Sequence, residues 1–519
     1  MQTITTKVLI VGAGPTGLMM ACQLQRFGID FLLIDKKSGT TKESRALGVQ
    51  TRTLEIYDQM GLASTAINNG YSVNWINLVV SGKPIWKISF RDIGNDLSQF
   101  PFLHILEQSK NESILYEHLT TDNHKHVLWN TELIEFTDDG KTISAKVKNG
   151  SGEETEIIAD WLVAADGAKS IVRHQLNVEF LGGTYENLYY VADTEVNWDM
   201  PRGLYIVLSA NYFNLFFPMQ GENKYRVIGM LPRQFQNEGE IDFNDIQESI
   251  IKTTGIKLTF GITNWFSTYR IHHRCVTNFR HGRCFLAGDA AHVHSPVGAQ
   301  GMNTGLQDAY NLAWKLALVV KKFANEELLD SYNEERLAIV KRLVKTTDTA
   351  FELIVSKNPI IRFFVLNFFP MIVKFLMQFR TFKRFVYKTI SQIKINYCNS
   401  PISLGNTNNI MAGIRFPYFR LNINSQSISV YDLFRENKFV VMTYNIGDID
   451  MIHKYFATKF NNLFVVKDIN NNSDILKQIG FSDSFICIVR PDNYIAYIRS
   501  YLDLTEIDNY LIKQLQLNP

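Results

Sequence analysis

Residues 287–317 place one carboxylate and a glycine-punctuated loop directly before a long amphipathic segment. Asp289 is expected where a short strand ends, and a helix is predicted to open near residues 301–303. A carboxylate can bind a polyol, and the backbone N–H groups of a helix start attract anions, because that end carries about half a positive charge. These groups suit the ribityl chain and the pyrimidine end of a flavin, which is an anion when reduced. The alternative is a buried helix behind a glycine-rich loop, with no ligand.

A second glycine-rich turn, GAGPTG, begins at Gly12 and lies between segments that predict a Rossmann-like unit. The strand, helix and strand of this unit are predicted at residues 7–11, 18–27 and 30–34. Glycines in such a turn allow a tight bend and a close approach of the backbone to a pyrophosphate. Asp35 ends the second strand, where an acidic side chain binds a ribose hydroxyl. The turn predicts a dinucleotide site, and it does not distinguish NAD from FAD.

A third element of the same kind is the segment LVAADGAKSIVR at residues 162–173. An apolar strand ends there in Asp166 and Gly167, and Ser170 and Arg173 follow at a predicted helix start. A nicotinamide dehydrogenase would not normally need a second Asp-and-glycine loop as far downstream as Asp289. Three such elements within the first 300 residues favour a long cofactor, FAD, threaded through one domain.

The segments GAGPTGL, ADGAKSIVR and AGDAAHVHSPVGAQGMNTGLQDAYNLAWKLA resemble those of the aromatic-hydroxylase family of FAD-dependent monooxygenases, the single-component flavoprotein hydroxylases. The resemblance covers essentially the whole chain and points to the subgroup with a thioredoxin-like C-terminal domain. It implies an α/β fold (α+β overall). The implied parts are a Rossmann-like FAD-binding domain, an inserted β-sheet substrate domain and a C-terminal thioredoxin-like domain.

The resemblance also implies roles for single residues. Asp35 matches the side chain that binds the adenosine ribose, although the family more often has Glu there. Arg45 matches an arginine at the phosphate region, Gln108 a glutamine near the ribityl chain and Asp289 the ribityl-binding carboxylate. The remaining implied cofactor contacts are Gly12, Gly14, Thr16 and Gly17 at the pyrophosphate, Asp166 and Gly167 in the Asp-Gly motif, and Pro296, Gly298, Gly301, Met302 and Asn303 beside the isoalloxazine ring.

Each of these residues also has an interpretation without a ligand. Arg45 and Arg52 could be solvated charges on a helix face, and Gln108 could be an ordinary polar residue near a helix start. His292 and His294 lie two positions apart, but no cysteine or carboxylate pair completes a metal site, so we expect loop packing and no metal.

The resemblance implies that NADPH or NADH reduces FAD and that the reduced flavin and O₂ give a C4a-hydroperoxide. Its oxygen then passes to an aromatic substrate, such as a phenol, a polyketide or a xenobiotic. The sequence has no second GxGxxG, so NAD(P)H is expected to bind transiently. The sequence assigns no catalytic base. Two alternatives stay open: a flavin-dependent reductase or dehydrogenase acting on an isoprenoid or lipid-like substrate, and an inactive flavin-binding scaffold.

Length and composition fit an intracellular enzyme of several domains. The 519 residues are 46% hydrophobic, enough for about three domains, and the net charge of +2 gives no electrostatic case for nucleic acid. The five cysteines are scattered and form no CxxC, which predicts no disulfide framework. The sequence enters its first strand without a signal-like segment. We therefore expect a cytoplasmic protein.

The predicted domains follow from changes in pattern along the chain. Alternating or apolar runs in the insertion predict a sheet that lines a substrate cavity, with Phe213, Phe216, Phe217 and Pro218 as lining candidates beside Pro296. The alternative is that these aromatic side chains are simply sheet core. The predicted boundaries are 1–180 and 280–350 for the FAD-binding domain, 181–279 for the insertion, 351–402 for a helical connector and 403–519 for the thioredoxin-like domain.

Residues 403–519 predict the order β-α-β-α-β-β-α, which resembles thioredoxin. The first strands of such a domain are parallel, and their crossover should be right-handed. Because the redox CxxC is missing, we expect this domain to serve in packing or in a homodimer interface and not in thiol chemistry.

The connector has an unusual charge pattern. No Asp or Glu occurs from Leu353 to Tyr431, and nine phenylalanines lie between Phe351 and Phe385. Its longest uncharged run is far shorter than the roughly 20 residues of a membrane span, and Pro370 interrupts it. A basic, aromatic and amphipathic stretch can instead lie on an anionic membrane, so weak surface contact through residues 353–394 is one expectation. The alternative is a linker whose phenylalanine face packs on the flavin domain.

Overall fold

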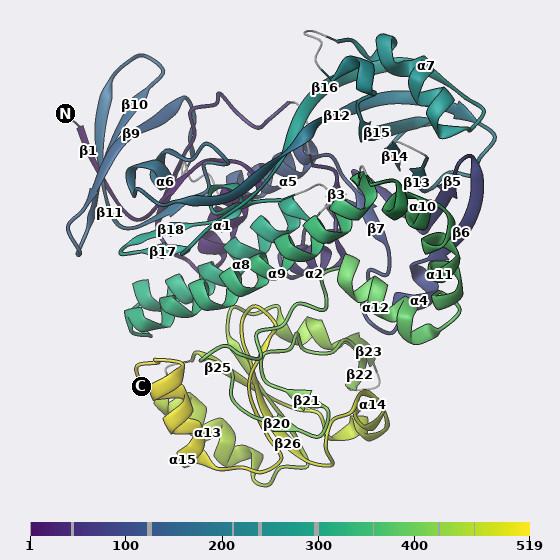
Figure 1. Cartoon of the computed structure of the whole chain (residues 1–519). Helices are drawn as coiled ribbons and strands as arrows, with labels where there is room; N and C mark the ends of the chain where they lie inside the picture. The colour runs from purple at the N-terminus through teal and green to yellow at the C-terminus, as the bar shows by residue number, and fades with distance from the viewer. Residues whose placement is uncertain are drawn as a thin grey trace.

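The computed structural model describes residues 2–42, 46–121, 127–209, 212–236, 241–294, 300–356, 358–423, 426–460 and 462–519. Figure 1 shows a first sheet with its helices on the left, a second sheet at the upper right and a C-terminal domain at the bottom. Two long helices, α8 (Gly301–Val320) and α9 (Asp330–Val355), run between these three parts.

The first sheet is built on buried parallel strands. The strand β1 pairs in parallel with β2 and β11, and β11 pairs in parallel with β18. The end of β1, from Val8 to Val11, is apolar throughout, as expected of a strand buried on both faces. On this sheet α1 (Pro15–Arg26) packs against α5 (Gln108–Thr120) and α8. The strands are β1 (Gln2–Val11), β2 (Phe31–Ile34), β8 (Val127–Leu128), β9 (Thr131–Asp138), β10 (Ile143–Asn149), β11 (Glu154–Ala164), β17 (Arg280–His281) and β18 (Cys284–Leu286).

The second sheet has the order β19-β16-β12-β15-β14-β13-β5-β6. The insertion forms the predicted sheet, but β5, β6 and β19 come from outside the predicted range 181–279. The strands β5 and β6 join because β5 pairs in parallel with β13, a pairing between distant parts of the chain that local pattern does not reveal. The strands are β5 (Trp75–Val80), β6 (Lys83–Ser89), β12 (Phe180–Trp198), β13 (Leu204–Leu208), β14 (Phe213–Pro218), β15 (Lys224–Met230), β16 (Leu258–Val276) and β19 (His292–Val293).

The two faces of the second sheet have different partners. The outer face packs on α7 (Phe243–Thr254), where Phe243 meets Phe266 of β16. The inner face packs against Phe351 of α9 and against a small sheet ordered β3-β7-β4. The small sheet and its neighbouring helices are β3 (Gly48–Val49), β4 (Tyr71–Val73), β7 (Leu103–Ile105), α2 (Thr51–Gln59), α3 (Ala63–Asn68) and α4 (Arg91–Gly94). The short helix α6 (Ile171–Gln175) lies against β9 of the first sheet.

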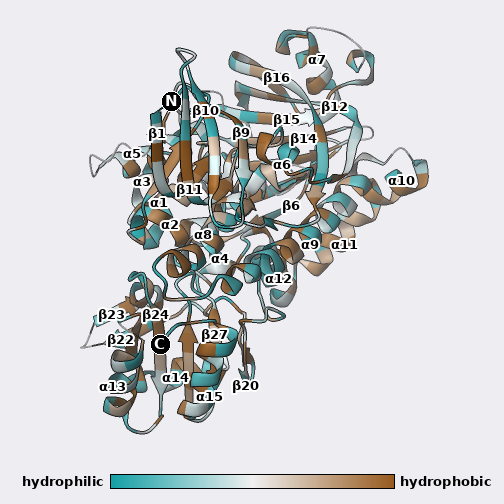
Figure 2. Cartoon of the chain, turned by 90° about the vertical axis from the view of Figure 1, so that its left-hand side faces the viewer, coloured by the Kyte–Doolittle hydropathy of each residue, from teal (hydrophilic) through white to brown (hydrophobic). Residues whose placement is uncertain are grey.

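Three short helices follow α9 and lead to the C-terminal domain: α10 (Pro359–Asn367), α11 (Phe369–Leu376) and α12 (Arg380–Ile390). Asn358 caps α10 by accepting a hydrogen bond from the backbone N–H of Ile360 at 2.9 Å. Pro370 lies in the first turn of α11, where the missing N–H does no harm. Figure 2 shows α10 and α11 at its right-hand side, with much of both ribbons hydrophobic.

From β24 onward the C-terminal domain has the predicted element order, and four short strands, β20 to β23, precede it. Its sheet is ordered β25-β24-β26-β27, with β24 parallel to β25 and antiparallel to β26. The order and the parallel first pair are confirmed, while the resemblance to thioredoxin stays a prediction. The elements are β20 (Asn406–Thr407), β21 (Ile410–Met411), β22 (Arg420–Ile423), β23 (Gln426–Ser429), β24 (Phe439–Tyr444), α13 (Ile449–Lys459), β25 (Phe464–Asp468), α14 (Ser473–Ile479), β26 (Phe485–Val489), β27 (Ile495–Arg499) and α15 (Leu504–Asn509).

Buried charges join the C-terminal domain to the first domain. Arg490 donates to both carboxylate oxygens of Glu335 on α9, at 2.6 and 3.0 Å, and to Asp492. Lys315 of α8 donates to the same Glu335 at 2.8 Å. All four side chains are buried, and the nearby cations hold the pKa of Glu335 well below its usual value although burial alone would raise it. Arg52, which the sequence left open as a solvated charge, is also buried and donates to the backbone of Asp492 at 2.7 Å.

Replacing Arg490 by Met tests this interface. The change leaves two carboxylates buried without their guanidinium, which costs about 3–5 kcal/mol when a buried pair is broken. Urea unfolding of Arg490→Met should therefore show a clearly lower midpoint. Lys477→Met is the control, because its ion pair with Asp483 is exposed and its loss should change stability by about 0.5 kcal/mol or less. Equal shifts in the two variants would contradict the role of the buried network.

Candidate functional site

The turn between β1 and α1 is shaped by glycine. Gly12 has a φ of +102°, and a Cβ there would lie 2.4 Å from the carbonyl oxygen of Ala165. A Cβ at Gly17 would lie 1.8 Å from the carbonyl oxygen of Gly12. These two glycines are therefore required by the protein's own packing. Gly14 differs, because a Cβ there would meet no protein atom within 4 Å and its φ is −80°. Glycine at this position leaves open space at the start of α1, where a pyrophosphate would lie.

The GAGPTG turn and the segment 287–317 meet through Thr16. A Cβ on Gly288 or on Gly305 would come within 2.4 Å of the Thr16 Oγ1, so α1 and α8 approach closely only because both positions are glycine. Gly288 belongs to the short turn that carries Asp289, and Gly305 lies in the second turn of α8. The starts of the two helices are thus held beside each other.

The segment 162–173 joins them through Arg173 on α6. Its guanidinium donates to the carbonyl oxygen of Ala290 at 2.9 Å and to that of Ala168 at 2.7 Å. One side chain thereby links the Asp166-Gly167 loop to the turn that holds Asp289. The structure therefore brings all three predicted segments to one place, although they are separated by more than a hundred residues in the sequence.

Asp166 offers a free polar atom at this place. Its Oδ2 accepts from the backbone N–H of Val172 at 3.3 Å, whereas its Oδ1 is buried with no partner among the described residues. Burial raises the pKa of this carboxyl group, although hydrogen bonds from Ser170 and from the backbone oppose the shift. Gly167 beside it has a φ of +80° and an open side. An unsatisfied buried oxygen of this kind fits a ligand that donates a hydrogen bond.

The start of α8 has no side-chain cap, so its first backbone N–H groups face outward from the helix. Asn303 is fully buried and bridges to the segment after β3, because its Oδ1 accepts from Gln50 at 2.8 Å and its Nδ2 donates to Gly48 at 2.8 Å. The Sδ of Met302 accepts from Asn111 at 3.4 Å. The Asn303 side chain therefore positions the helix, and a contact of this residue with the cofactor stays a prediction. Gly301 opens the helix, and the Asp289 side chain is exposed.

Asp35 and Gln108 both hold backbone in place. The Asp35 carboxylate accepts from the backbone N–H of Ala13 at 2.6 Å and of Lys37 at 2.8 Å. The Oε1 of Gln108 accepts from the backbone N–H of Ala46 at 3.3 Å. Their predicted contacts with the ribose and the ribityl chain stay predictions. Arg45, Pro296 and Gly298 lie outside the described residues.

Sequence reasoning missed a buried network behind the site. Asp308 of α8 accepts from the backbone N–H of Gly288 at 3.0 Å, from His292 at 2.7 Å and from Arg336 at 2.7 Å. Burial would raise the pKa of Asp308, but the Arg336 guanidinium and His292 outweigh it and lower the pKa. The network fixes the turn before Asp289, which agrees with the loop-packing role expected for His292. The sequence feature that could have indicated this network is Asp308, a carboxylate inside the apolar stretch that forms α8.

The candidate lining residues divide between the two faces of the second sheet. Phe213 and Phe217 belong to the inner clusters, and Phe213 lies 6.0 Å from the ring of Phe351. Phe216 points to the outer face, where its ring lies 4.9 Å from that of Trp198. Pro218 is buried two positions further along β14, on the same side as Phe216. The structure therefore places only Phe213 and Phe217 toward the first domain.

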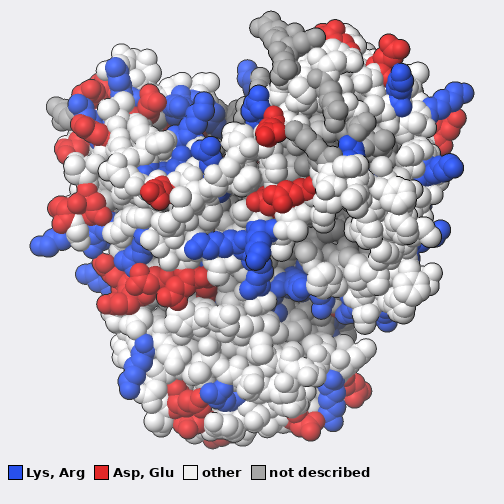
Figure 3. All heavy atoms as spheres, viewed as in Figure 1, with Lys and Arg blue, Asp and Glu red and all other residues white. Residues whose placement is uncertain are grey.

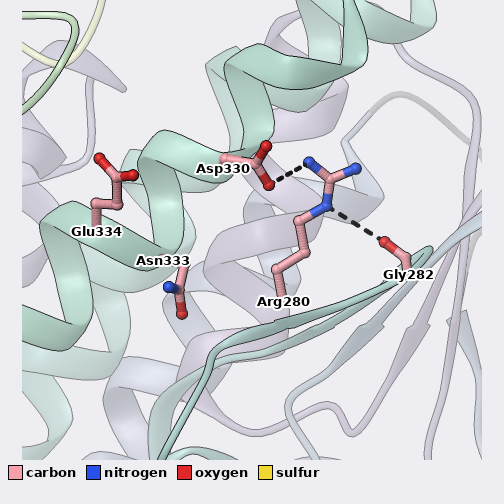
Figure 4. A pocket seen from close by; sticks show the side chains of 5 residues that line it. All are labelled: Arg280, Gly282, Asp330, Asn333 and Glu334. Carbon is pink, nitrogen blue, oxygen red and sulfur yellow. Dashed lines mark hydrogen bonds and ion pairs between the residues drawn. The ribbon is translucent and has the colours of Figure 1, made fainter.

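A hollow of about 470 Å³ lies apart from these loops. Figure 4 shows Arg280 in it, paired with Asp330 at 2.8 Å and with the carbonyl oxygen of Gly282. None of the predicted site residues lines this hollow, and its one cationic residue, Arg280, is paired with Asp330. It is a surface feature beside the start of α9.

Comparison with known proteins agrees with the geometry. The FAD binding domain family matches residues 5–347. A 6-methylpretetramide 4-monooxygenase from Streptomyces rimosus is 34% identical over 404 residues, which cover 77% of this chain and 71% of that protein. A pentachlorophenol 4-monooxygenase from Sphingobium chlorophenolicum is 30% identical over 370 residues, covering 68% and 66%. A solved flavin-dependent monooxygenase in complex with FAD and substrate shares the fold, with a TM-score of 0.80, 19% identity and 99% of each chain covered.

The fold and the three converging loops define a flavoprotein. A dinucleotide with a flavin end fits the open glycine turn, the unsatisfied buried carboxylate oxygen and the two helix starts without a side-chain cap. The chain belongs to the FAD binding domain family and is a flavin-dependent aromatic monooxygenase. FAD would be held by the α1 turn, the Asp166 loop, Asp289 and the start of α8.

Replacing Gly14 by Ala tests the pyrophosphate position. A methyl group there meets no protein atom, so the fold should be unaffected, whereas it would intrude on a phosphate at the helix start. We expect FAD affinity to fall at least about tenfold, which is roughly 1.4 kcal/mol. Fluorescence titration of the apoprotein with FAD measures the change. Gly447→Ala is the control, since its Cβ also meets open space but lies in the C-terminal domain. Unchanged affinity in Gly14→Ala would place the pyrophosphate elsewhere.

Replacing Asp308 by Asn tests the network behind the site. Arg336 would stay buried without its carboxylate, and breaking such a pair costs about 3–5 kcal/mol. We expect a lower thermal midpoint and partial loss of FAD, with excess FAD raising the midpoint again by mass action. Asp330→Asn is the control, because the carboxylate that pairs with Arg280 is 64% exposed. If both variants keep FAD and stability equally, the network does not support the loop.

Proposed function

We propose that this enzyme uses NADPH or NADH and O₂ to hydroxylate an aromatic substrate of polyketide or xenobiotic type. The observation that carries the proposal is the convergence of three cofactor loops in a chain whose second sheet has an aromatic inner face. The two relatives are named for a pretetramide and for pentachlorophenol, and these names support a polyketide and a xenobiotic substrate, respectively.

The substrate would lie between the start of α8 and the inner face of the second sheet. That face carries Tyr189 and Tyr269, whose rings lie 6.3 Å apart, with Phe213 beside them. Aromatic rings of this kind bury large apolar area and favour edge or offset contacts with another ring. A fused-ring phenol therefore suits the face better than a small polar molecule does.

The residues of the chain would bind the cofactor and the substrate, orient them and shield them from water. Bound FAD supplies the redox and oxygen-transfer chemistry. The uncapped start of α8 stabilises negative charge at the pyrimidine end of that cofactor, as a preorganised dipole does. The apolar inner clusters of the second sheet exclude water from the space beside it.

Further parts of the proposal rest on sequence. The chain has one GxGxxG turn, so NAD(P)H would bind transiently without a Rossmann domain of its own. The C-terminal domain lacks CxxC and would serve in packing or in a homodimer. The five cysteines are all free, which suits the reducing cytoplasm as the compartment.

Substrate-stimulated NAD(P)H oxidation by the FAD-loaded protein tests the function. We expect phenolic polyketides and chlorinated phenols to raise the oxidation rate, with isotope-labelled O₂ placing one oxygen atom in the product. Gly14→Ala should lose both signals in proportion to its FAD content, and Gly447→Ala should keep them. NAD(P)H consumption that never labels a product would contradict the proposal and favour the reductase.

A further inference from the structure

The exposed hydrophobic side chains of this protein are concentrated on one helical hairpin. We call α10, α11 and the intervening Phe368 the apolar hairpin. Ten of the seventeen large hydrophobic side chains that are exposed in the described residues lie between Ile360 and Phe385. Ile360 is 77% exposed and Met371 68%. Contiguous apolar surface of this kind on a soluble protein marks an interaction site. The phenylalanine face therefore does not pack on the flavin domain, which was the alternative for this segment.

The hairpin and the following helix are attached to the body of the protein along their other side. Leu366 packs on the inner cluster of the second sheet, and Pro370 is buried. Tyr387 of α12 is buried, with its ring 5.5 Å from that of Phe90 and its hydroxyl 3.2 Å from Thr51. Arg384 pairs with Asp96 at 2.6 Å. The hairpin is thus attached through few side chains, since α10 has no fully buried residue and α11 has only Pro370.

Positive charge surrounds this apolar surface. The segment from Leu353 to Tyr431 has no carboxylate, and Lys374 and Lys394 are exposed on or beside the hairpin. Figure 3 shows largely uncharged surface over α10 and α11 at the right-hand side. A groove of about 960 Å³ follows between α12 and the C-terminal domain. Two carboxylates, Asp96 and Asp474, line it, and Asp96 pairs with Arg380 and Arg384. Its cationic lining residues are Arg380, Arg384, Lys388, Lys394, Arg415 and Arg420.

This charge pattern favours an anionic membrane over a second copy of the chain as the partner of the apolar hairpin. A second copy of the chain would set the same patch against itself in a two-fold dimer, so cations would face cations with no carboxylate from the segment to pair them. A bilayer with anionic headgroups instead offers an apolar layer for the hairpin and negative charge for its rim, worth about 1 kcal/mol for each Lys or Arg near the surface.

The geometry also decides how the hairpin would sit. Residues 359–376 are, among those the structure describes, one stretch long and apolar enough to cross a membrane, and only 6% of the stretch is buried. However, α9 before it and α12 after it pack on the same body, which a crossing would place on opposite sides. The break at Phe368 and Pro370 also divides the stretch into two short helices. Helices of this kind lie in the interfacial plane.

We propose that the apolar hairpin docks this enzyme on the surface of an anionic lipid bilayer, with Lys374 of α11 and Lys383 of α12 on the headgroups. The proposal is independent of the substrate and of the oxygen chemistry. It concerns a surface outside the cofactor loops.

Vesicle flotation of the FAD-loaded full-length protein tests the proposal. The probes are vesicles of phosphatidylcholine alone and vesicles of equal parts phosphatidylcholine and phosphatidylglycerol. We expect the protein to float with the mixed vesicles at low salt, to float less with the neutral ones and to be released in part by high salt, because salt screens the headgroup attraction. Failure to float with mixed vesicles at low salt would overturn the proposal, as would equal binding to both vesicle types.

Variants locate the surface. The triple variant Ile360→Ser, Met371→Ser, Phe375→Ser should bind at least about a hundredfold more weakly, because each exposed side chain loses its burial in the bilayer. The matched control is Leu181→Ser, Ile262→Ser, Met451→Ser, three exposed apolar side chains elsewhere. FAD content verifies that both variants fold.

Single charge changes refine the test. Lys374→Gln should weaken partitioning about fivefold, whereas Lys454→Gln, an exposed lysine of α13, should leave it unchanged. Equal losses in test and control variants would show that the hairpin is not the docking surface. A dimer that the triple hairpin variant abolishes, without any vesicle binding by the wild type, would overturn the proposal in favour of a second copy.

Discussion

The close contact between α1 and α8 is the constraint on which the cofactor site depends. Two helix starts can lie side by side only if their backbones approach closely, and here Gly288 and Gly305 provide that approach around Thr16. Each helix start brings a partial positive charge and unsatisfied N–H groups to the same place. The Asp166 loop is then added by a single side chain, Arg173. The site is therefore a product of backbone packing more than of specialised side chains.

Buried charge is the second recurring element, and it is costly unless every group is paired. Asp308 accepts hydrogen bonds from one backbone N–H and from two cationic or polar side chains, and Glu335 accepts them from Arg490 and Lys315. Such pairs add little to stability when compared with apolar residues of the same size, but the loss of one partner is strongly unfavourable. These pairs fix the positions of α8 and α9 relative to their neighbours. The cofactor loops next to these helices are therefore fixed as well.

The sequence predicted the cofactor domain well because its signals are local. The turn at Gly12, the strands around it and the order of the C-terminal elements follow from spacing over a few residues, and the structure has them. Pairing between distant segments left no such signal, so β5 and β6 were missed in the second sheet. For the same reason Phe216 could not be separated from Phe213, because the face of a strand depends on its register. The role of Asp308 was missed because its partners come from two other segments, the turn at residues 288–292 and Arg336 of α9.

The C-terminal domain shares a core with the first domain. Trp314 of α8 meets the ring of Phe439 at 5.7 Å, and one continuous apolar cluster contains residues of both domains. The boundary near residue 403 is thus a change in sequence pattern and not a mechanical joint. Chimeras that exchange this domain between relatives would have to exchange the facing parts of α8 and α9 with it, because the buried charges on the two sides must match. Recombination at the apparent boundary would join parts that do not fit, which limits this domain as an interchangeable module.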